Sequence, residues 1–219
     1  MERTDFQKVI DFNVQFDVIQ GFNPEYTFRP DVAENSMKLI REEMREYARA
    51  VRDSDRLEQL DGLCDIKYVV LGLCARMGID IDRISYNNKH WYKQVVYNDP
   101  VLSLSAVVAN LDNAISSRTY SDITMSAYTL IHLTHKIGVD QGFNMSAAFN
   151  AVHENNMTKA SPTEDIAQQT VLSFANHAVY KDVDYRRAPD GENWVIYDRE
   201  QKKILKPLSY LAVDLREYL

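Results

Sequence analysis

Residues 37–51, MKLIREEMREYARAV, have the apolar periodicity of an amphipathic helix and carry Glu42, Glu43 and Glu46. At about 100° per residue, Glu42, Glu46 and Glu43 lie at roughly 0°, 40° and 100° around the helix, so they project within one arc. Like charges at this spacing repel one another unless something cancels them. The stretch therefore predicts a helix with one buried side and one strongly acidic side.

The next segment supplies a second acidic face. After a polar RDSD turn, a helix is expected over about 56–77, ending at Gly78, and it contains LDGLCDIKYVVLGLC at 60–74. Asp61 and Asp65 are four residues apart and share one side of this helix. Because two helices joined by a short loop pack antiparallel, we expect these aspartates to face the three glutamates, so that carboxylates line one groove.

An exposed acidic face is the simpler interpretation, since like charges at helical spacing cost only about 0.2–0.5 kcal/mol per pair in water. The apolar neighbours of Asp65 favour a metal site instead. A buried carboxylate without a partner costs several kcal/mol, and the nearby cations are Lys67 and Arg41. Oxygen ligands suit Mg²⁺ or Mn²⁺, and four or five carboxylates predict two or three ions bound with a phosphate chain.

Composition narrows the possible partners and location. The 219 residues are 45% hydrophobic with a net charge of -7, which suits a globular chain and disfavours binding to polymeric nucleic acid or to a membrane. The start MERTDFQKVIDF is too charged for a signal peptide, and the apolar run 68–74 is too short to span a bilayer. We therefore expect a cytoplasmic protein. Cys64 and Cys74, ten residues apart on one helix, are expected to be core thiols.

The rest of the chain predicts an all-α antiparallel bundle with a small C-terminal β-hairpin. Few glycines and prolines interrupt the helical patterns until about residue 183, where residues alternate around an Asp190-Gly191 turn up to about 206. We expect the bundle to occupy 1–180 and the hairpin and tail to occupy 181–219. Further helices are expected to begin at Asp99-Pro100, Ser121, Asn144 and the SPTED sequence at 161–165.

The two central helix pairs resemble each other. Gly78-Ile79-Asp80 closes the pair at 35–80, and Gly138-Val139-Asp140 closes a pair at 100–140. An offset of 60 aligns the second helices and one of 64 aligns the first, and the second pair has lost every acid. This pattern predicts a degenerate internal duplication; chance agreement between two amphipathic pairs is the alternative.

The ordered motifs resemble the all-α nucleoside triphosphate pyrophosphatase superfamily, which includes MazG-like enzymes, dimeric dUTPases and phosphoribosyl-ATP pyrophosphohydrolases. They are the EExxE at 42–46, the acids before an apolar run that ends in GID at 78–80, and AFNAVHENNMTK at 148–159. The tail KKILKPLSYLAVDL at 202–215 resembles that of phage-type members. One departure stands out: the family's ExxD motif has Glu three residues before Asp, where this chain has Gly62. Asp61 with Asp65 is the favoured substitute, and Glu58 with Asp61 is the alternative.

The resemblance implies a reaction, namely metal-dependent hydrolysis of a nucleoside triphosphate between its α and β phosphates. It assigns the ions to Glu43, Glu46, Asp61 and Asp65, and the attacking water to Glu42. Substrates of relatives include dGTP, dUTP, dCTP, aberrant nucleotides and phosphoribosyl-ATP, which suits nucleotide-pool cleansing or phage nucleotide metabolism in a bacterial or phage-infected cell. A non-catalytic nucleotide- or partner-binding protein is the alternative class. The resemblance also implies a homodimer or higher homo-oligomer.

Four further residues are candidate substrate contacts through the same resemblance. Asn156 and Lys159 match an NMxK element, and Lys206 and Tyr210 belong to the tail. Ordinary helix capping and a solvated lysine-rich edge are the competing interpretations. Trp91 and Tyr92 are candidates for base stacking, although aromatic residues in a linker more often pack against the protein body.

Overall fold

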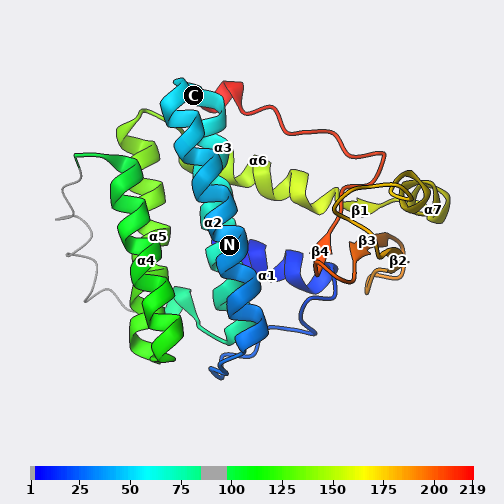
Figure 1. Ribbon diagram of the computed structural model, residues 1–219, viewed down its shortest axis with the longest axis horizontal. Helices are drawn as coiled ribbons and strands as arrows, with labels where there is room; N and C mark the ends of the chain where they lie inside the picture. Colours follow the sequence, from blue (N-terminus) through cyan, green and yellow to red (C-terminus); the bar gives the residue numbers. More distant parts are fainter. Residues whose placement is uncertain (1–2, 85–97) are drawn as a thin grey trace. The chain divides into compact units, whose positions relative to one another are not determined.

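The chain forms two compact units in a computed structural model that describes residues 3–84 and 98–219 (Figure 1). The first unit contains residues 1–10, 22–152 and 214–219, and the second contains residues 11–21 and 153–213. Residues 153–180, which the sequence assigns to the helical body, thus group with the C-terminal strands. Trp91 and Tyr92 lie outside the described residues.

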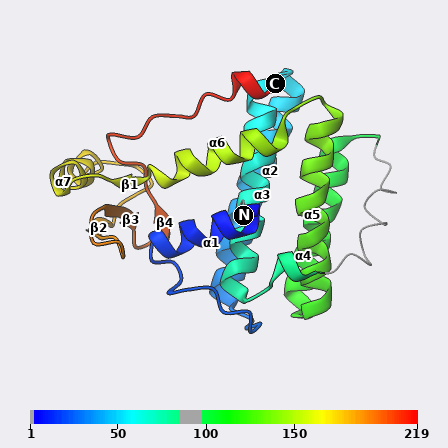
Figure 2. The same cartoon turned by 180° about the vertical axis from the view of Figure 1, so that it is seen from behind.

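Helices build the first unit, so the predicted all-α body is confirmed. Helix α2 pairs with α3 and α4 with α5, while α3 packs on α5 and α2 on α4, giving a four-helix bundle (Figure 1 and Figure 2). Helices α1 and α6 each begin in the first unit and end in the second. The bounds are α1 (Asp5–Gln15), α2 (Pro30–Asp53), α3 (Arg56–Met77), η1 (Ile81–Arg83), α4 (Pro100–Ser117), α5 (Tyr120–Asp140), α6 (Met145–Met157) and the C-terminal η4 (Arg216–Tyr218).

The ends of α3 follow the sequence signals closely. The Asp55 carboxylate accepts hydrogen bonds from the backbone N–H groups of Leu57 and Glu58, which satisfies donors that an α-helix leaves free at its first turn. Gly78 ends the helix with φ of 71°, a left-handed conformation that glycine adopts without a Cβ clash. The predicted span of 56–77 is therefore confirmed.

Two other helix starts differ from the expected ones. Helix α2 begins one turn earlier than an Asn35 cap implies, with Arg29 at the N-cap and Pro30 as its first residue. Helix α5 begins at Tyr120 after Thr119 and runs past Gly138 to Asp140. Proline at the first helical position needs no N–H partner, so α2 begins there without a side-chain cap.

A buried ion pair ties α1 to α3 within the first unit. Lys67, only 5% exposed, donates from Nζ to Asp5 Oδ2 at 2.5 Å and lies 4.6 Å above the centre of the Phe149 ring. Lys8 donates to the other Asp5 oxygen at 3.3 Å and also to Asn150 Oδ1. Burial raises the pKa of Asp5, but the charges and hydrogen bonds of Lys67 and Lys8 outweigh it, so the pKa is lowered below 3.8.

Asp5→Asn should therefore lower the free energy of unfolding by about 2–3 kcal/mol, because it leaves the Lys67 ammonium buried without its counterion. Since the folded-state pKa of Asp5 is lowered, the stabilisation is present above the unfolded pKa and is lost as the pH falls through the folded pKa. Urea unfolding at neutral pH measures the change. Asp31→Asn, in an exposed pair with Arg29, is the control and should change stability by less than about 0.5 kcal/mol; an equal loss in both variants would contradict this account.

The second unit contains a small antiparallel sheet, so the predicted hairpin is confirmed. Its central pairing aligns Val183 with Asp198 and Arg187 with Trp194, and the turn contains Gly191 with φ of 72°. The Asp190 carboxylate accepts the N–H groups of Glu192 and Asn193 at 2.8 and 3.0 Å, which fixes this turn. The strands are β1 (Ala160–Ser161), β2 (Val183–Arg187), β3 (Trp194–Asp198) and β4 (Lys203–Ile204), in the order β1-β3-β2 with β4 also on β3.

Helix α7 (Glu164–Ser173) covers this sheet, and its N-cap is Thr163, whose hydroxyl accepts the Ile166 N–H at 3.3 Å. Ala167 packs with Ile196 of β3 and Leu205 in one buried cluster. This packing explains why the segment groups with the strands.

Two further expectations concern the thiols and membranes. Cys64 and Cys74 are both free and buried, as predicted. None of the helices that the structure describes is both long and apolar enough to cross a membrane.

Candidate metal and phosphate site

The acids of α2 border its buried stripe. Ile40, Met44 and Tyr47 are buried, while Glu42 and Glu43 are partly exposed and Glu46 is exposed. Glu43 lies only about 40° around the helix from Tyr47, which is buried against α3. The acidic side therefore begins at the edge of the contact with α3 and extends toward solvent.

The acids of α3 lie on its only accessible strip. From Gln59 to Met77 every residue of this helix is buried except Asp61, Asp65, Val69 and Arg76, which are partly exposed. The expectation that apolar neighbours bury Asp65 is therefore wrong in degree, because residues four apart keep one side of the helix open. Solvent and small ions can reach both carboxylates.

Gly62 marks the closest approach of the two helices. A Cβ built on Gly62 would lie 3.2 Å from Tyr47 Cβ and 3.3 Å from Tyr47 Cα, closer than side chains normally pack. Position 62 thus points at the backbone of α2 and has no room for an acid. Around α3, Asp65 lies about 60° and Asp61 about 100° from Gly62, so both border the contact line without filling it.

The two cations near the acids have aspartate partners of their own. Lys67 pairs with Asp5, and Arg41 pairs with Asp112 of α4 at 2.7 Å. Burial raises the pKa of the Cys64 thiol, and the charges of Asp65 and Asp61 raise it further, while Lys67 opposes them. Both aspartates thus act electrostatically on the core, as a site that attracts cations must.

The donor set is suitable for a hard divalent cation, because it consists of carboxylate oxygens on accessible faces. Within residues 3–84 and 98–219, no group of three or more Asp, Glu, His or Cys side chains is already arranged to hold a metal ion. Magnesium needs no such group, since one or two carboxylates with water and substrate phosphates complete its shell. The residues that would hold it are Glu43 and Glu46 on α2 with Asp61 and Asp65 on α3.

Comparison with known proteins identifies the segment that carries these acids. Residues 6–89 match the family model described as phosphoribosyl-ATP pyrophosphohydrolase. This segment belongs to the all-α nucleoside triphosphate pyrophosphatase superfamily. The pyrophosphatase match contains both acidic helices, so a pyrophosphohydrolase-type enzyme is the general class of this protein.

One relative matches the pyrophosphatase chain over nearly its whole length. It is the mimivirus protein "Uncharacterized protein L479" from Acanthamoeba polyphaga mimivirus, 28% identical over 99% of this chain and 96% of its own length. No solved structure matches significantly.

The four other predicted contacts lie in the second unit. Asn156 is buried near the end of α6, and Lys159 follows in the next turn, where its N–H donates to the Asn156 carbonyl at 3.1 Å. Lys206 lies with Nζ 4.7 Å above the ring centre of Tyr210. Their contact with substrate stays a prediction.

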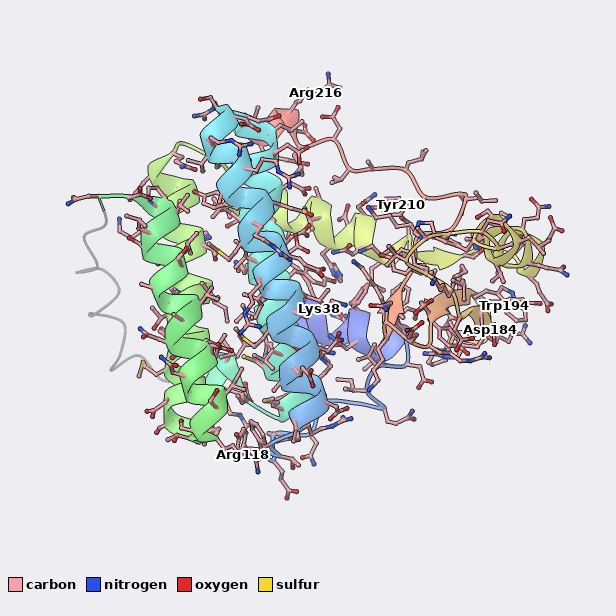
Figure 3. All side chains as sticks on the ribbon, viewed as in Figure 1. Lys38, Arg118, Asp184, Trp194, Tyr210 and Arg216 are labelled. Carbon is pink, nitrogen blue, oxygen red and sulfur yellow. The ribbon has the colours of Figure 1, made fainter. Side chains whose placement is uncertain are left out.

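Asn155 is a residue whose role the sequence did not indicate. Its Oδ1 accepts a hydrogen bond from the Tyr210 hydroxyl, and its Nδ2 donates to the Leu211 carbonyl at 2.7 Å (Tyr210 is labelled in Figure 3). Adjacent asparagines in HENNMTK give no signal that distinguishes the one that fastens the tail. Tyr210 therefore has a structural role in this unit.

Proposed function

We propose that the protein hydrolyses a nucleoside or deoxynucleoside triphosphate to the monophosphate and pyrophosphate. The observation that carries the proposal is the placement of Asp61 and Asp65 on the only open strip of α3, inside the pyrophosphatase match. Divalent ions held there would neutralise phosphate oxygens and polarise the bond to be broken.

The residues of the chain divide the remaining work. Glu43 and Asp65, closest to the helix contact, hold the positions from which carboxylates can share ions between α2 and α3. Glu42 lies about 100° from Glu43 on α2, where it can orient a water or accept its proton. The phosphoryl chemistry itself needs positioning and charge neutralisation more than a covalent intermediate.

Phosphoribosyl-ATP is the second candidate substrate, favoured by the family that residues 6–89 match. It carries the same triphosphate chemistry, so the acids would act in the same way. The discrimination between the two lies in the group attached to the α phosphate.

A substrate panel tests the proposal. The protein is incubated with the common NTPs and dNTPs, dUTP and phosphoribosyl-ATP, each with Mg²⁺ or Mn²⁺ and each with EDTA, and pyrophosphate is measured with a coupled assay. We expect pyrophosphate release from at least one compound and its loss with EDTA. Ligand-induced thermal stabilisation without any pyrophosphate release would instead support a non-catalytic nucleotide-binding protein.

A further inference from the structure

The turns inside the two central helix pairs repeat after 64 residues. Ser54 ends α2 with φ of 59° and Arg118 ends α4 with φ of 55°, and neither is a glycine. A left-handed residue of this kind is uncommon outside glycine, so two of them at equivalent places are a specific match. The backbone bonds are Ser54 N to Val51 O (3.2 Å) and Asp55 N to Ala50 O (2.9 Å), matched by Arg118 N to Ile115 O (3.1 Å) and Thr119 N to Ala114 O (3.3 Å).

The far ends of α3 and α5 repeat after the same 64 residues. Gly78 and Gly142 have φ of 71° and 87°. The offset of 60, which aligns Gly78 with Gly138, is therefore wrong: Gly138 lies within α5, and Gly142 follows its end. The bonds are Gly78 N to Ala75 O (3.5 Å) and Ile79 N to Cys74 O (2.9 Å), matched by Gly142 N to Val139 O (3.0 Å) and Phe143 N to Gly138 O (2.9 Å).

Two more features keep this register. The Asp80 carboxylate accepts the Arg83 N–H at 3.3 Å, and the Asn144 side chain accepts the Ala147 N–H at 3.3 Å. The buried residues of the first helices also correspond one to one: Ile40, Met44, Tyr47 and Ala50 of α2 with Leu104, Val108, Leu111 and Ala114 of α4.

The pairs run in opposite directions, as a local two-fold axis requires. Arg118, at the turn of the second pair, lies 5.3 Å from the Phe28 ring centre just before α2 (Figure 3). Arg56, at the turn of the first pair, lies 4.8 Å from the Phe143 ring centre and donates to the Gln141 carbonyl at the end of α5. Each turn thus meets the open end of the other pair.

We infer that α4–α5 is a second copy of α2–α3, in one register of 64 residues, that completes the bundle without a site of its own. The loss of the site rests on the proposed function. Positions equivalent to the acids hold uncharged side chains, so each chain has one metal and phosphate site. The replacements are Ala106, Val107 and Asn110 for the three glutamates, and Met125 and Thr129 for Asp61 and Asp65.

Engineered disulfides test the register independently of any activity. Tyr47 and Gly62 are in contact, so their equivalents Leu111 and Ser126 should accept a disulfide. We expect Leu111→Cys with Ser126→Cys to cross-link on mild oxidation at least tenfold faster than Leu111→Cys with Asp122→Cys, the pair that an offset of 60 predicts. Ala114→Cys with Ile123→Cys, equivalent to the bonded Ala50 and Gln59, is a second test pair should the first variant fold poorly. Preferential cross-linking at 122, or none in both test pairs, would overturn the register.

Binding of Mn²⁺ alone, measured by equilibrium dialysis, tests the single site. The wild-type chain should bind ions, and the Glu43→Gln/Asp65→Asn variant should lose all of them. Retention of half or more of the ions would place a second site elsewhere and overturn the one-site inference. No binding by the wild-type chain would count against the proposed function and the one-site claim together, while the cross-links still decide the repeat.

Discussion

Asp65→Asn should lower kcat for pyrophosphate release by about 100-fold or more, which corresponds to about 3 kcal/mol of transition-state stabilisation. The substitution keeps the shape of the side chain and removes the charge that would hold a divalent ion against the phosphates. Because Asp65 is partly exposed on an otherwise buried helix, asparagine there should not disturb the core. Steady-state kinetics and a thermal melt of the same preparation measure the two effects.

Glu58→Gln is the matched variant on the same helix, since Glu58 is an exposed acid in the first turn of α3. It should leave kcat within about twofold, because its N–H, not its carboxylate, is part of the helix cap. A large loss in Glu58→Gln with full activity in Asp65→Asn would move the site to the Glu58 and Asp61 pair.

Gly62→Glu should destabilise the fold, although it restores the acid that the superfamily motif has at this position. Overpacking costs about 1–3 kcal/mol, and forcing a carboxylate against the α2 backbone adds to it. A total of about 3 kcal/mol corresponds to a fall in Tm of roughly 10 °C for a chain of this length. Differential scanning calorimetry measures the change, and the activity should fall with it.

Two glycine variants calibrate that result. Gly62→Ala should cost about 1 kcal/mol or less, because the Cβ contact with Tyr47 works against alanine's better helix propensity. Gly21→Ala should stay within about 0.5 kcal/mol of the wild type, since nothing lies within 4 Å of its Cβ. A Gly62→Glu protein as stable as the wild type would show that α2 and α3 do not meet as closely as described here.

The acidic helix pair was predictable because each step depends on local chemistry. The periodicity of 37–51, the Asp55 and Gly78 signals and the short turn between them fix two antiparallel helices. The same reasoning put Asp61 and Asp65 on one side of α3. It overestimated their burial, since apolar neighbours in sequence lie on the other sides of the helix.

The features that the sequence did not reveal depend on tertiary contacts. Asp5 looks like an ordinary first-turn acid, and only the fold brings it to Lys67, 62 residues later. The packing role of Gly62 requires knowledge of where α2 crosses α3. The register of the second helix pair was misjudged because Gly138-Val139-Asp140 imitates the closing motif while lying inside the longer α5.

The most direct measurement is ³¹P NMR of the products formed from the best substrate of the panel with Mg²⁺. The account predicts nucleoside monophosphate and pyrophosphate in equal amounts with the wild-type chain, and no products with the Glu43→Gln/Asp65→Asn chain under the same conditions. Nucleoside diphosphate and inorganic phosphate as products, or full turnover by the variant, would contradict it.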